Sequence, residues 1–259
     1  MAKKIKASKL IDLFQQALNE GWGYIWGTAG ELWTQKKQDA LANETSSNYD
    51  QAKKYGSKWI GKMVTDCSGL FNYAFDKLGS YIPHGSNSIW KNYCSSKGKL
   101  VNGKRSDGKE LKDATALFRT TGEDRHHIGL YMYGEIIDAR STQKGVTDDS
   151  ELSSWDEWGE LKYVDYDEVI IVIEQAKVIG GSLNLRSGTS TSANKIVSIP
   201  NGAVVDVIEK TDNEWWKITY SGKTGYVMSK FLTSAGSEMI TLNRSVAQTF
   251  FEALKVALG

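Results

Sequence analysis

The chain has 259 residues and a mass of 28.8 kDa, a length that predicts one medium-sized domain and a smaller one. Hydrophobic residues make up 40% of the sequence, which is enough to build packed cores and excludes general disorder. The 32 basic and 31 acidic residues nearly cancel, so the charge gives no reason to expect nucleic acid as a partner.

No stretch is long and apolar enough to span a bilayer, so we expect no membrane insertion. The basic start of the chain lacks the apolar segment of a secretory signal, because Asp12 and two glutamines interrupt it. We therefore expect a protein that stays in the cytoplasm until it is released or exported by another route.

The cysteines and histidines are few: Cys67, Cys94, His84, His126 and His127. Two cysteines exclude a disulfide framework and a multi-cysteine zinc site, and we expect no metal. Cys94 is interpreted as a packed thiol. The loop residue His84 could line a cleft, although a loop histidine is more often incidental.

Two helices can be predicted from the apolar spacing. The first has Ser8 as its N-cap and ends at Gly21. The second follows Asp66, carries Cys67 in its first turn and ends at Gly79. Between them, residues 31–65 are too long for a simple connection, so they either form helices of their own or a functional lid.

After the second helix, the apolar pattern changes to the period of strands, which are predicted at 115–119, 127–133, 135–139 and 169–173. Gly134 marks a tight turn between the second and the third, which predicts a hairpin. Residues 1–175 therefore read as an α+β domain in which helices pack on an antiparallel sheet.

Residues 176–234 predict a small β-barrel, because short strands alternate with the turn dipeptides Asn201-Gly202 and Ser221-Gly222. Residues 235–259 predict a linker and a C-terminal helix with one apolar face. That helix more often docks on its own domain, but it could support self-association.

Cys67 is the candidate nucleophile. At the start of a helix, a thiol faces the positive end of the backbone dipole, which favours the thiolate, and nearby N–H groups could stabilise an oxyanion. The alternative is that Cys67 is a small buried apolar residue.

A thiolate enzyme needs a base, and His126 and His127 point to opposite faces of a predicted strand. Gly129 shares the face of His127 and would let another element approach there, but the alternation alone does not choose between the two histidines. Asp138, on the next strand, falls near His127 if the hairpin pairs, where it would orient the ring; otherwise it is a surface aspartate.

With these residues the chain resembles the NlpC-type papain-like cysteine peptidases, which hydrolyse peptide or amide bonds of bacterial peptidoglycan. The resemblance covers roughly residues 5–175 and lies in three segments: Tyr24-Ile25-Trp26-Gly27, Asp66-Cys67-Ser68-Gly69-Leu70 and His127-Ile128-Gly129-Leu130-Tyr131. It implies Cys67 as nucleophile and His127 as base, with Asp138 at a third catalytic position where the family commonly has His, Asn or Gln.

The same resemblance implies that Tyr24, Asp66 and Ser68 shape the site and hold the amino end of the stem peptide. Residues 183–188, 215–218 and 225–227 resemble the bacterial SH3-like domain, which is associated with cell-wall binding. The alternative for Arg186, Trp215 and Tyr226 is that they only pack and cap a barrel.

The sequence therefore predicts a peptidoglycan hydrolase without metal or organic cofactor, with peptidoglycan as its partner. The resemblance favours a γ-D-glutamyl-diamino acid endopeptidase, and the missing signal suggests a phage or prophage endolysin. The alternatives are an N-acetylmuramoyl-L-alanine amidase and a non-catalytic wall-binding protein.

Overall fold

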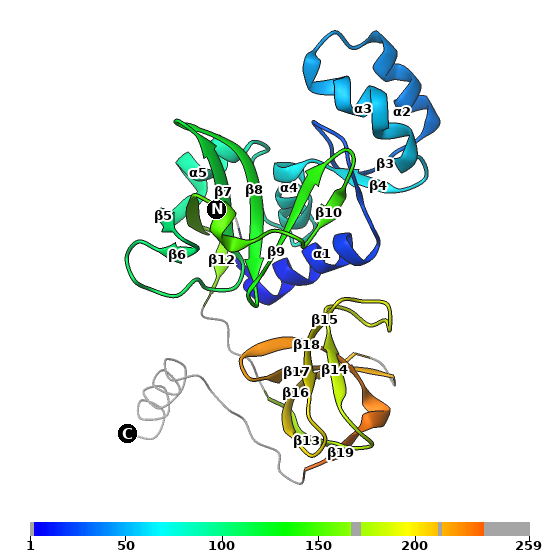
Figure 1. The fold of residues 1–259 in the computed structure, drawn as a ribbon, viewed down its shortest axis with the longest axis vertical. Coiled ribbons are helices and arrows are strands. Elements are labelled where there is room, and N and C mark those ends of the chain that lie inside the picture. Colours follow the sequence, from blue (N-terminus) through cyan, green and yellow to red (C-terminus); the bar gives the residue numbers. More distant parts are fainter. Residues whose placement is uncertain (1–2, 167–171, 212–213, 236–259) are drawn as a thin grey trace. The chain divides into compact units, whose positions relative to one another are not determined.

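The computed structural model describes residues 3–166, 172–211 and 214–235, and the chain divides into two compact units, Met1–Tyr166 and Asp167–Gly259 (Figure 1). The predicted linker and C-terminal helix, residues 235–259, lie outside the described residues apart from Ala235, as does most of the predicted strand 169–173. The predicted domain limit at residue 175 falls inside a strand of the second unit, Glu174–Val178. Within the described residues, no helix has both the length and the apolar character needed to cross a membrane.

Three helices form the framework of the first unit: α1 (Ala7–Asn19), α4 (Cys67–Lys77) and α5 (Ser86–Tyr93). Helix α4 starts at Cys67, as predicted. Helix α1 starts before the predicted N-cap Ser8, and Lys6 precedes it without a side-chain cap. The reason is that the chain enters α1 directly from β1 (Ile5–Lys6), whose parallel pairing with β12 (Val164–Asp165) already fixes the backbone.

A seven-stranded antiparallel sheet stands beside these helices, in the order β10-β9-β8-β7-β11-β5-β6. Three of its strands confirm the predicted ones. The bounds are β5 (Cys94–Val101), β6 (Lys104–Arg105), β7 (Thr115–Thr121), β8 (Asp124–Met132), β9 (Glu135–Ser141), β10 (Gly145–Thr147) and β11 (Glu157–Leu161). A smaller sheet has the order β2-β4-β3, with bounds Gly23–Tyr24, Met63–Thr65 and Ala29–Leu32.

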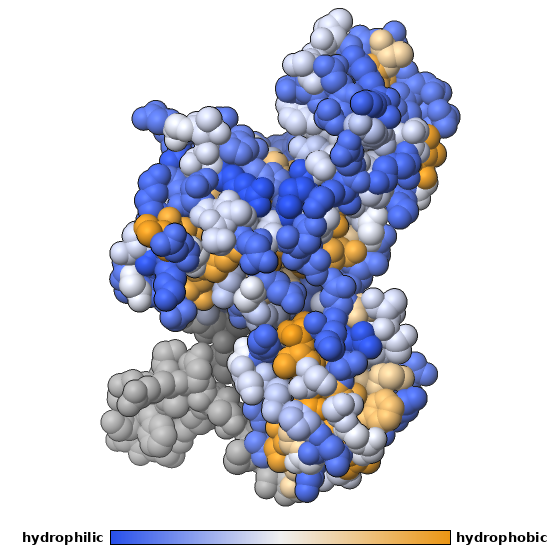
Figure 2. Space-filling view, viewed as in Figure 1, coloured by the Kyte–Doolittle hydropathy of each residue, from blue (hydrophilic) through white to orange (hydrophobic). Residues whose placement is uncertain are grey.

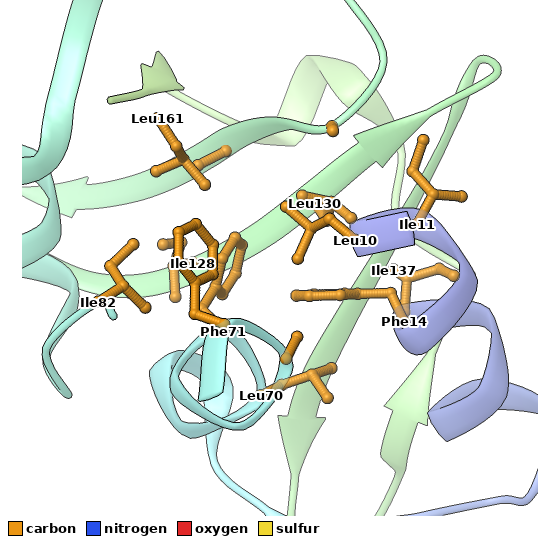
Figure 3. Close-up of a cluster of buried hydrophobic side chains, with 14 of the residues drawn as sticks. Leu10, Ile11, Phe14, Leu70, Phe71, Ile82, Ile128, Leu130, Ile137 and Leu161 are labelled. Carbon is orange, nitrogen blue, oxygen red and sulfur yellow. The ribbon is translucent and has the colours of Figure 1, made fainter. Parts of the chain in front are cut away.

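The core of the first unit lies between α1, α4 and the strands β8 and β9 (Figure 3). Phe14 of α1 meets Phe71 of α4 edge to face, with ring centroids 4.8 Å apart. Ile128 and Leu130 of β8 approach from the sheet, and both are fully buried. Burying each side chain of this size stabilises the fold by about 1.5–3 kcal/mol, so α4 is anchored against β8 along its apolar face.

The β8–β9 hairpin is confirmed, with the register Leu130↔Ile137 and Met132↔Glu135. Its two turn residues, Tyr133 and Gly134, have φ values of 51° and 88°, the left-handed pair that matches the twist of a two-residue hairpin. This register determines which side chains of β8 and β9 are neighbours on each face of the sheet.

Residues 31–65 form short helices of their own rather than a structureless connection. These are α2 (Gln35–Ala40), α3 (Asp50–Tyr55) and the 3-10 turns η1 (Leu41–Asn43), η2 (Ser47–Tyr49) and η3 (Gly56–Trp59). They enclose a separate small core of Ile25, Trp33, Leu41, Ala52, Trp59 and Val64. Tyr49 also meets Trp26 edge to face, with ring centroids 5.3 Å apart, and Trp26 stays 41% exposed.

The second unit is a seven-stranded antiparallel sheet around a core of its own, in the order β15-β14-β18-β17-β16-β13-β19. Its elements are β13 (Glu174–Val178), β14 (Leu183–Arg186), β15 (Lys195–Ile199), β16 (Val204–Lys210), β17 (Trp215–Tyr220), β18 (Lys223–Met228), η5 (Ser229–Phe231) and β19 (Leu232–Ser234). The predicted Ser221-Gly222 turn joins β17 to β18, with both φ values positive.

The surface agrees with this distribution of apolar residues. On the face that Figure 2 displays, the first unit is mostly hydrophilic and its apolar residues form small separate patches. The amphipathic pattern of α1 explains this, because its apolar residues Leu10, Ile11 and Phe14 are buried in the core.

Candidate active site

Cys67 is the first residue of α4, and its position is set by Asp66, the N-cap. The Asp66 Oδ1 accepts a hydrogen bond from the Gly69 N–H at 2.7 Å, and Oδ2 accepts one from the Gly27 N–H at 2.8 Å. The Asp66 N–H donates to the Thr28 carbonyl at 2.9 Å. Gly69 permits this close packing, since a Cβ there would lie 2.0 Å from the same Thr28 oxygen. The helix start is therefore tied to the loop between β2 and β3.

The thiol of Cys67 differs from the sequence-based expectation. Burial, followed by the negative charge of Asp66, raises the pKa of Cys67 to about 12, although backbone N–H groups of Ile128 and Ser68 act in the opposite direction. The expectation that the helix start favours the thiolate is wrong for the substrate-free protein, because desolvation outweighs the effect of these backbone N–H groups. The resting sulfur is a thiol, so its ionisation requires a nearby base.

His127 lies on β8, and the backbone N–H of the following residue, Ile128, is close enough to Cys67 to act on the pKa of its thiol. The His127 Nε2 lies 2.6 Å from the Asp138 Oδ2. Since a carboxylate only accepts, Nε2 carries the hydrogen, and Nδ1 is the nitrogen able to take a proton. His126 is exposed, and its Nδ1 lies 3.4 Å from the Thr121 hydroxyl. The structure therefore separates the two histidines that the strand period left equivalent.

Asp138 is buried on β9 and binds three side chains. The Arg140 Nε donates to Oδ2 at 2.6 Å and its Nη2 donates to Oδ1 at 2.8 Å, while the Ser150 hydroxyl donates to Oδ1 at 3.3 Å. Burial by itself would raise the pKa of Asp138, but the hydrogen bonds from Arg140 and His127 hold it below its usual value. Asp138 is thus a fixed anion beside the His127 ring, and the surface alternative is excluded.

Trp155 covers the His127 ring on one face. The two rings stack at a centroid distance of 5.5 Å and an interplanar angle of 25°, and the Arg119 guanidinium lies over Trp155 at 4.7 Å. A Cβ on Gly129 would lie 2.7 Å from Trp155 and 3.1 Å from the Asp138 Cβ. Gly129 thus creates the space for Trp155, in agreement with the predicted approach of another element there.

Tyr24, on β2, lies near the thiol. Burial raises the pKa of Tyr24 well above its usual value, and the neighbouring Cys67 and Asp66 raise it further. The hydroxyl therefore keeps its hydrogen at neutral pH and can act as a donor next to the candidate nucleophile.

His84, interpreted from the sequence as more often incidental, binds Asp66. Its Nε2 lies 2.8 Å from both carboxylate oxygens. The Ser68 hydroxyl donates to the Asp66 Oδ1 at 3.2 Å and accepts a hydrogen bond from the Gly85 N–H at 3.0 Å. Both neighbours of Cys67 are therefore already hydrogen-bonded within the chain.

Sequence reasoning missed two residues of this arrangement, Arg140 and Trp155. Arg140 had a usable signal, because residues two apart on a strand share a face and Arg140 follows Asp138 at that spacing. Trp155 had none, since it precedes β11 and reaches His127 only through the fold. Cys94, by contrast, is a free buried thiol that donates to the Ile89 carbonyl at 3.6 Å, as predicted.

Comparison with known proteins agrees with these motifs. The NlpC/P60 family matches residues 50–160, and the bacterial SH3 domain matches residues 181–233. The chain carries an NlpC/P60 domain followed by a bacterial SH3 domain. The resemblance predicted from the sequence is confirmed at this level.

Two curated relatives share short stretches with the chain. A probable endopeptidase p60 of Listeria innocua is 37% identical over 76 residues, which are 29% of this chain and 16% of the relative. A putative N-acetylmuramoyl-L-alanine amidase of Bacillus subtilis is 46% identical over 55 residues, 21% of this chain and 10% of the relative. The matched stretches thus span a small part of both relatives.

Solved structures of NlpC/P60 proteins match more of the chain at low identity. The P60 domain of an antigen of M. avium subspecies paratuberculosis is 15% identical, with 58% of this chain and 94% of that chain covered and a TM-score of 0.33. RipD of Mycobacterium tuberculosis, described as a non-catalytic NlpC/p60 domain protein, is 15% identical, with 58% and 96% covered and a TM-score of 0.33.

The contact between Gly129 and Trp155 predicts a specific coupling. Gly129→Ala should lower the free energy of unfolding by about 1–3 kcal/mol, because the added methyl group meets the six-membered part of the indole. Trp155→Phe removes those atoms, so the double variant should lose less stability than the sum of the single variants, by about 1 kcal/mol. Urea unfolding of the four proteins tests this, and strict additivity would contradict it.

The lowered pKa of Asp138 predicts a pH-dependent contribution to stability. A carboxylate with a depressed pKa stabilises the fold above its unfolded pKa of about 3.9, and this stabilisation is lost as the pH falls through the lowered folded value. Asp138→Asn should therefore cost about 2–4 kcal/mol at pH 7 and progressively less below about pH 4.

Denaturant unfolding across that pH range measures the effect of Asp138→Asn. Asp149→Asn is the matched control, because Asp149 is an exposed partner of the same arginine, with its Oδ1 3.2 Å from the Arg140 Nη2. Its effect should be much smaller, and equal effects of the two substitutions would contradict the prediction.

Proposed function

We propose that the protein is a peptidoglycan hydrolase that cleaves stem-peptide bonds through Cys67, His127 and Asp138. One observation carries this proposal: Asp138 binds the Nε2 of His127, and the backbone N–H of the next residue, Ile128, is close enough to Cys67 to act on the pKa of its thiol. That arrangement leaves Nδ1 of His127 to act on the thiol. The NlpC/P60 domain and the relative named endopeptidase support the reaction class.

The raised pKa of Cys67 indicates how the reaction begins. As the sulfur attacks the scissile carbonyl, His127 accepts the thiol proton and becomes an imidazolium, whose charge Asp138 stabilises. The carbonyl oxygen becomes an oxyanion. The backbone N–H groups of Cys67 and Ser68 at the start of α4 are its proposed donors, because the first N–H groups of a helix have no acceptor in a preceding turn, and the N–H of Gly69 is already held by Asp66.

The second half of the reaction uses the same base. His127 donates its proton to the leaving amine, so the C–N bond breaks and a thioester to Cys67 remains. Water then attacks the thioester while His127 accepts its proton, and the acid product leaves as the thiol is restored. The steps need no metal or organic cofactor.

For substrate contacts we propose Tyr24, Asp66 and Ser68, all of which adjoin Cys67. The Tyr24 hydroxyl is a neutral donor at physiological pH. In the substrate-free protein, Asp66 and Ser68 are hydrogen-bonded to His84 and Gly85, so an ammonium group of a substrate would bind there in competition with these contacts.

The γ-D-glutamyl-diamino acid bond is the proposed target, and the endolysin route stays a prediction from the sequence. The N-acetylmuramoyl-L-alanine amidase is the second candidate, because one relative carries that name. For the second unit, we propose attachment to the cell wall, supported by its bacterial SH3 domain.

Cys67→Ala should abolish the release of fragments from purified peptidoglycan, because it removes the proposed nucleophile. Cys94→Ala is the matched control and should retain activity, since Cys94 is buried in the core beside α5. Mass spectrometry of the digests identifies the bond. Fragments cut within the stem indicate the endopeptidase, and intact stems freed from lactyl groups indicate the amidase.

Equal release by the wild type and Cys67→Ala would exclude the proposed mechanism. If the wild type releases nothing from walls of several chemical types, the protein is a non-catalytic wall-binding protein.

The second unit should account for most of the attachment to walls. The inactive Cys67→Ala chain should sediment with purified walls, whereas residues 1–166 with the same substitution should bind at least tenfold more weakly. Each unit has its own core, so the truncated protein is a valid comparison. Equal sedimentation of both proteins would assign the attachment to the first unit.

A further inference from the structure

A two-residue segment, His84-Gly85, contacts both neighbours of Cys67. The His84 Nε2 lies 2.8 Å from each oxygen of Asp66, and the Gly85 N–H donates to the Ser68 hydroxyl at 3.0 Å. Gly85 has a φ of 110°, a conformation that favours glycine. The segment between α4 and α5 is thus hydrogen-bonded to the start of the helix that carries the sulfur.

The charge of His84 matters because Asp66 is an anion next to a thiol. The Asp66 charge, after burial, is the second cause of the raised pKa of Cys67. Within the described part of the chain, His84 is the one ion-pair partner of Asp66. Among the described residues, Asp66 also acts on the pKa of Tyr24 and Cys67, and neither of these two groups brings a positive charge.

His84 supplies that positive charge when its ring is protonated. Its hydrogen bond to Asp66 raises the pKa of His84, while burial acts in the opposite direction. The side chain is 37% exposed, so it can exchange protons with water. A raised pKa means that the imidazolium persists below the folded value and is lost as the pH rises through it.

We propose that His84 is a positioning residue that acts on Cys67 through Asp66. Its ring N–H holds both carboxylate oxygens and so fixes the cap of α4, and its positive charge offsets the carboxylate beside the sulfur. The inference concerns the reactivity of Cys67 and deepens the proposed function, since it adds a residue to the same site.

The test measures how fast iodoacetamide alkylates Cys67 between pH 5.5 and 9 in the full chain. Mass spectrometry of the digested protein separates Cys67 from the buried Cys94. His84→Gln keeps a hydrogen-bond donor but has no charge, and His84→Arg keeps a charge at every pH. His126→Gln is the matched control, because the same substitution is made at an exposed histidine that has no ion pair to Asp66.

At pH 6, His84→Gln should slow alkylation about 3- to 10-fold, since one pKa unit on the thiol changes the thiolate fraction tenfold. The difference should shrink as the pH rises through the His84 pKa, because the wild type then loses its charge as well. His84→Arg should restore the rate at low pH and exceed the wild type at high pH. His126→Gln should match the wild type throughout.

Equal rates for the wild type and His84→Gln at every pH would overturn the proposal, and so would a loss that His84→Arg does not restore. Circular dichroism and thermal unfolding confirm that the compared variants are folded. Because alkylation needs no substrate, this result is independent of peptidoglycan cleavage. A protein that cleaves nothing but shows the His84 effect would refute the proposed function and retain this inference.

Discussion

The Asp66 carboxylate is the interaction on which this site depends. It receives hydrogen bonds from Gly69 in α4, from Gly27 in the β2–β3 loop and from His84 in the segment before α5. Three separate parts of the chain therefore converge on one anion, and Cys67 is the next residue. A buried carboxylate is stable only when such donors surround it. The hydrogen bonds that satisfy Asp66 therefore also fix the position of the Cys67 sulfur.

A second buried carboxylate, Asp138, lies on the side of the base. Arg140 binds it with two nitrogens, and His127 binds it with one. Both carboxylates raise the pKa of Cys67, Asp66 more than Asp138. In the proposed reaction the proton therefore leaves the sulfur as the sulfur attacks, and Asp138 stabilises the charge that His127 then takes up.

The chain has two further parts besides this centre, the segment 31–65 and the second unit. The short helices of the segment have their own core and bring Tyr49 against Trp26, two residues after Tyr24. The second unit has an independent core and carries the bacterial SH3 domain. We expect NlpC/P60 proteins that share the same central residues to differ in these parts, and through them in substrate choice and wall attachment.

From the sequence alone, α4, the strands β7, β8 and β9 and the β8–β9 turn could be predicted, because periodicity and turn residues are local properties. The pairing of His127 with Asp138 followed from that hairpin, since register links two strands close in sequence. The strand period left His126 and His127 equivalent and the family resemblance implied His127. Only the tertiary structure showed the bond from His127 to Asp138, stacked Trp155 on the ring and joined His84 to Asp66. It also reversed the expected ionisation of Cys67. These contacts depend on burial and on residues distant in the chain, and neither desolvation nor long-range packing is encoded in a local pattern.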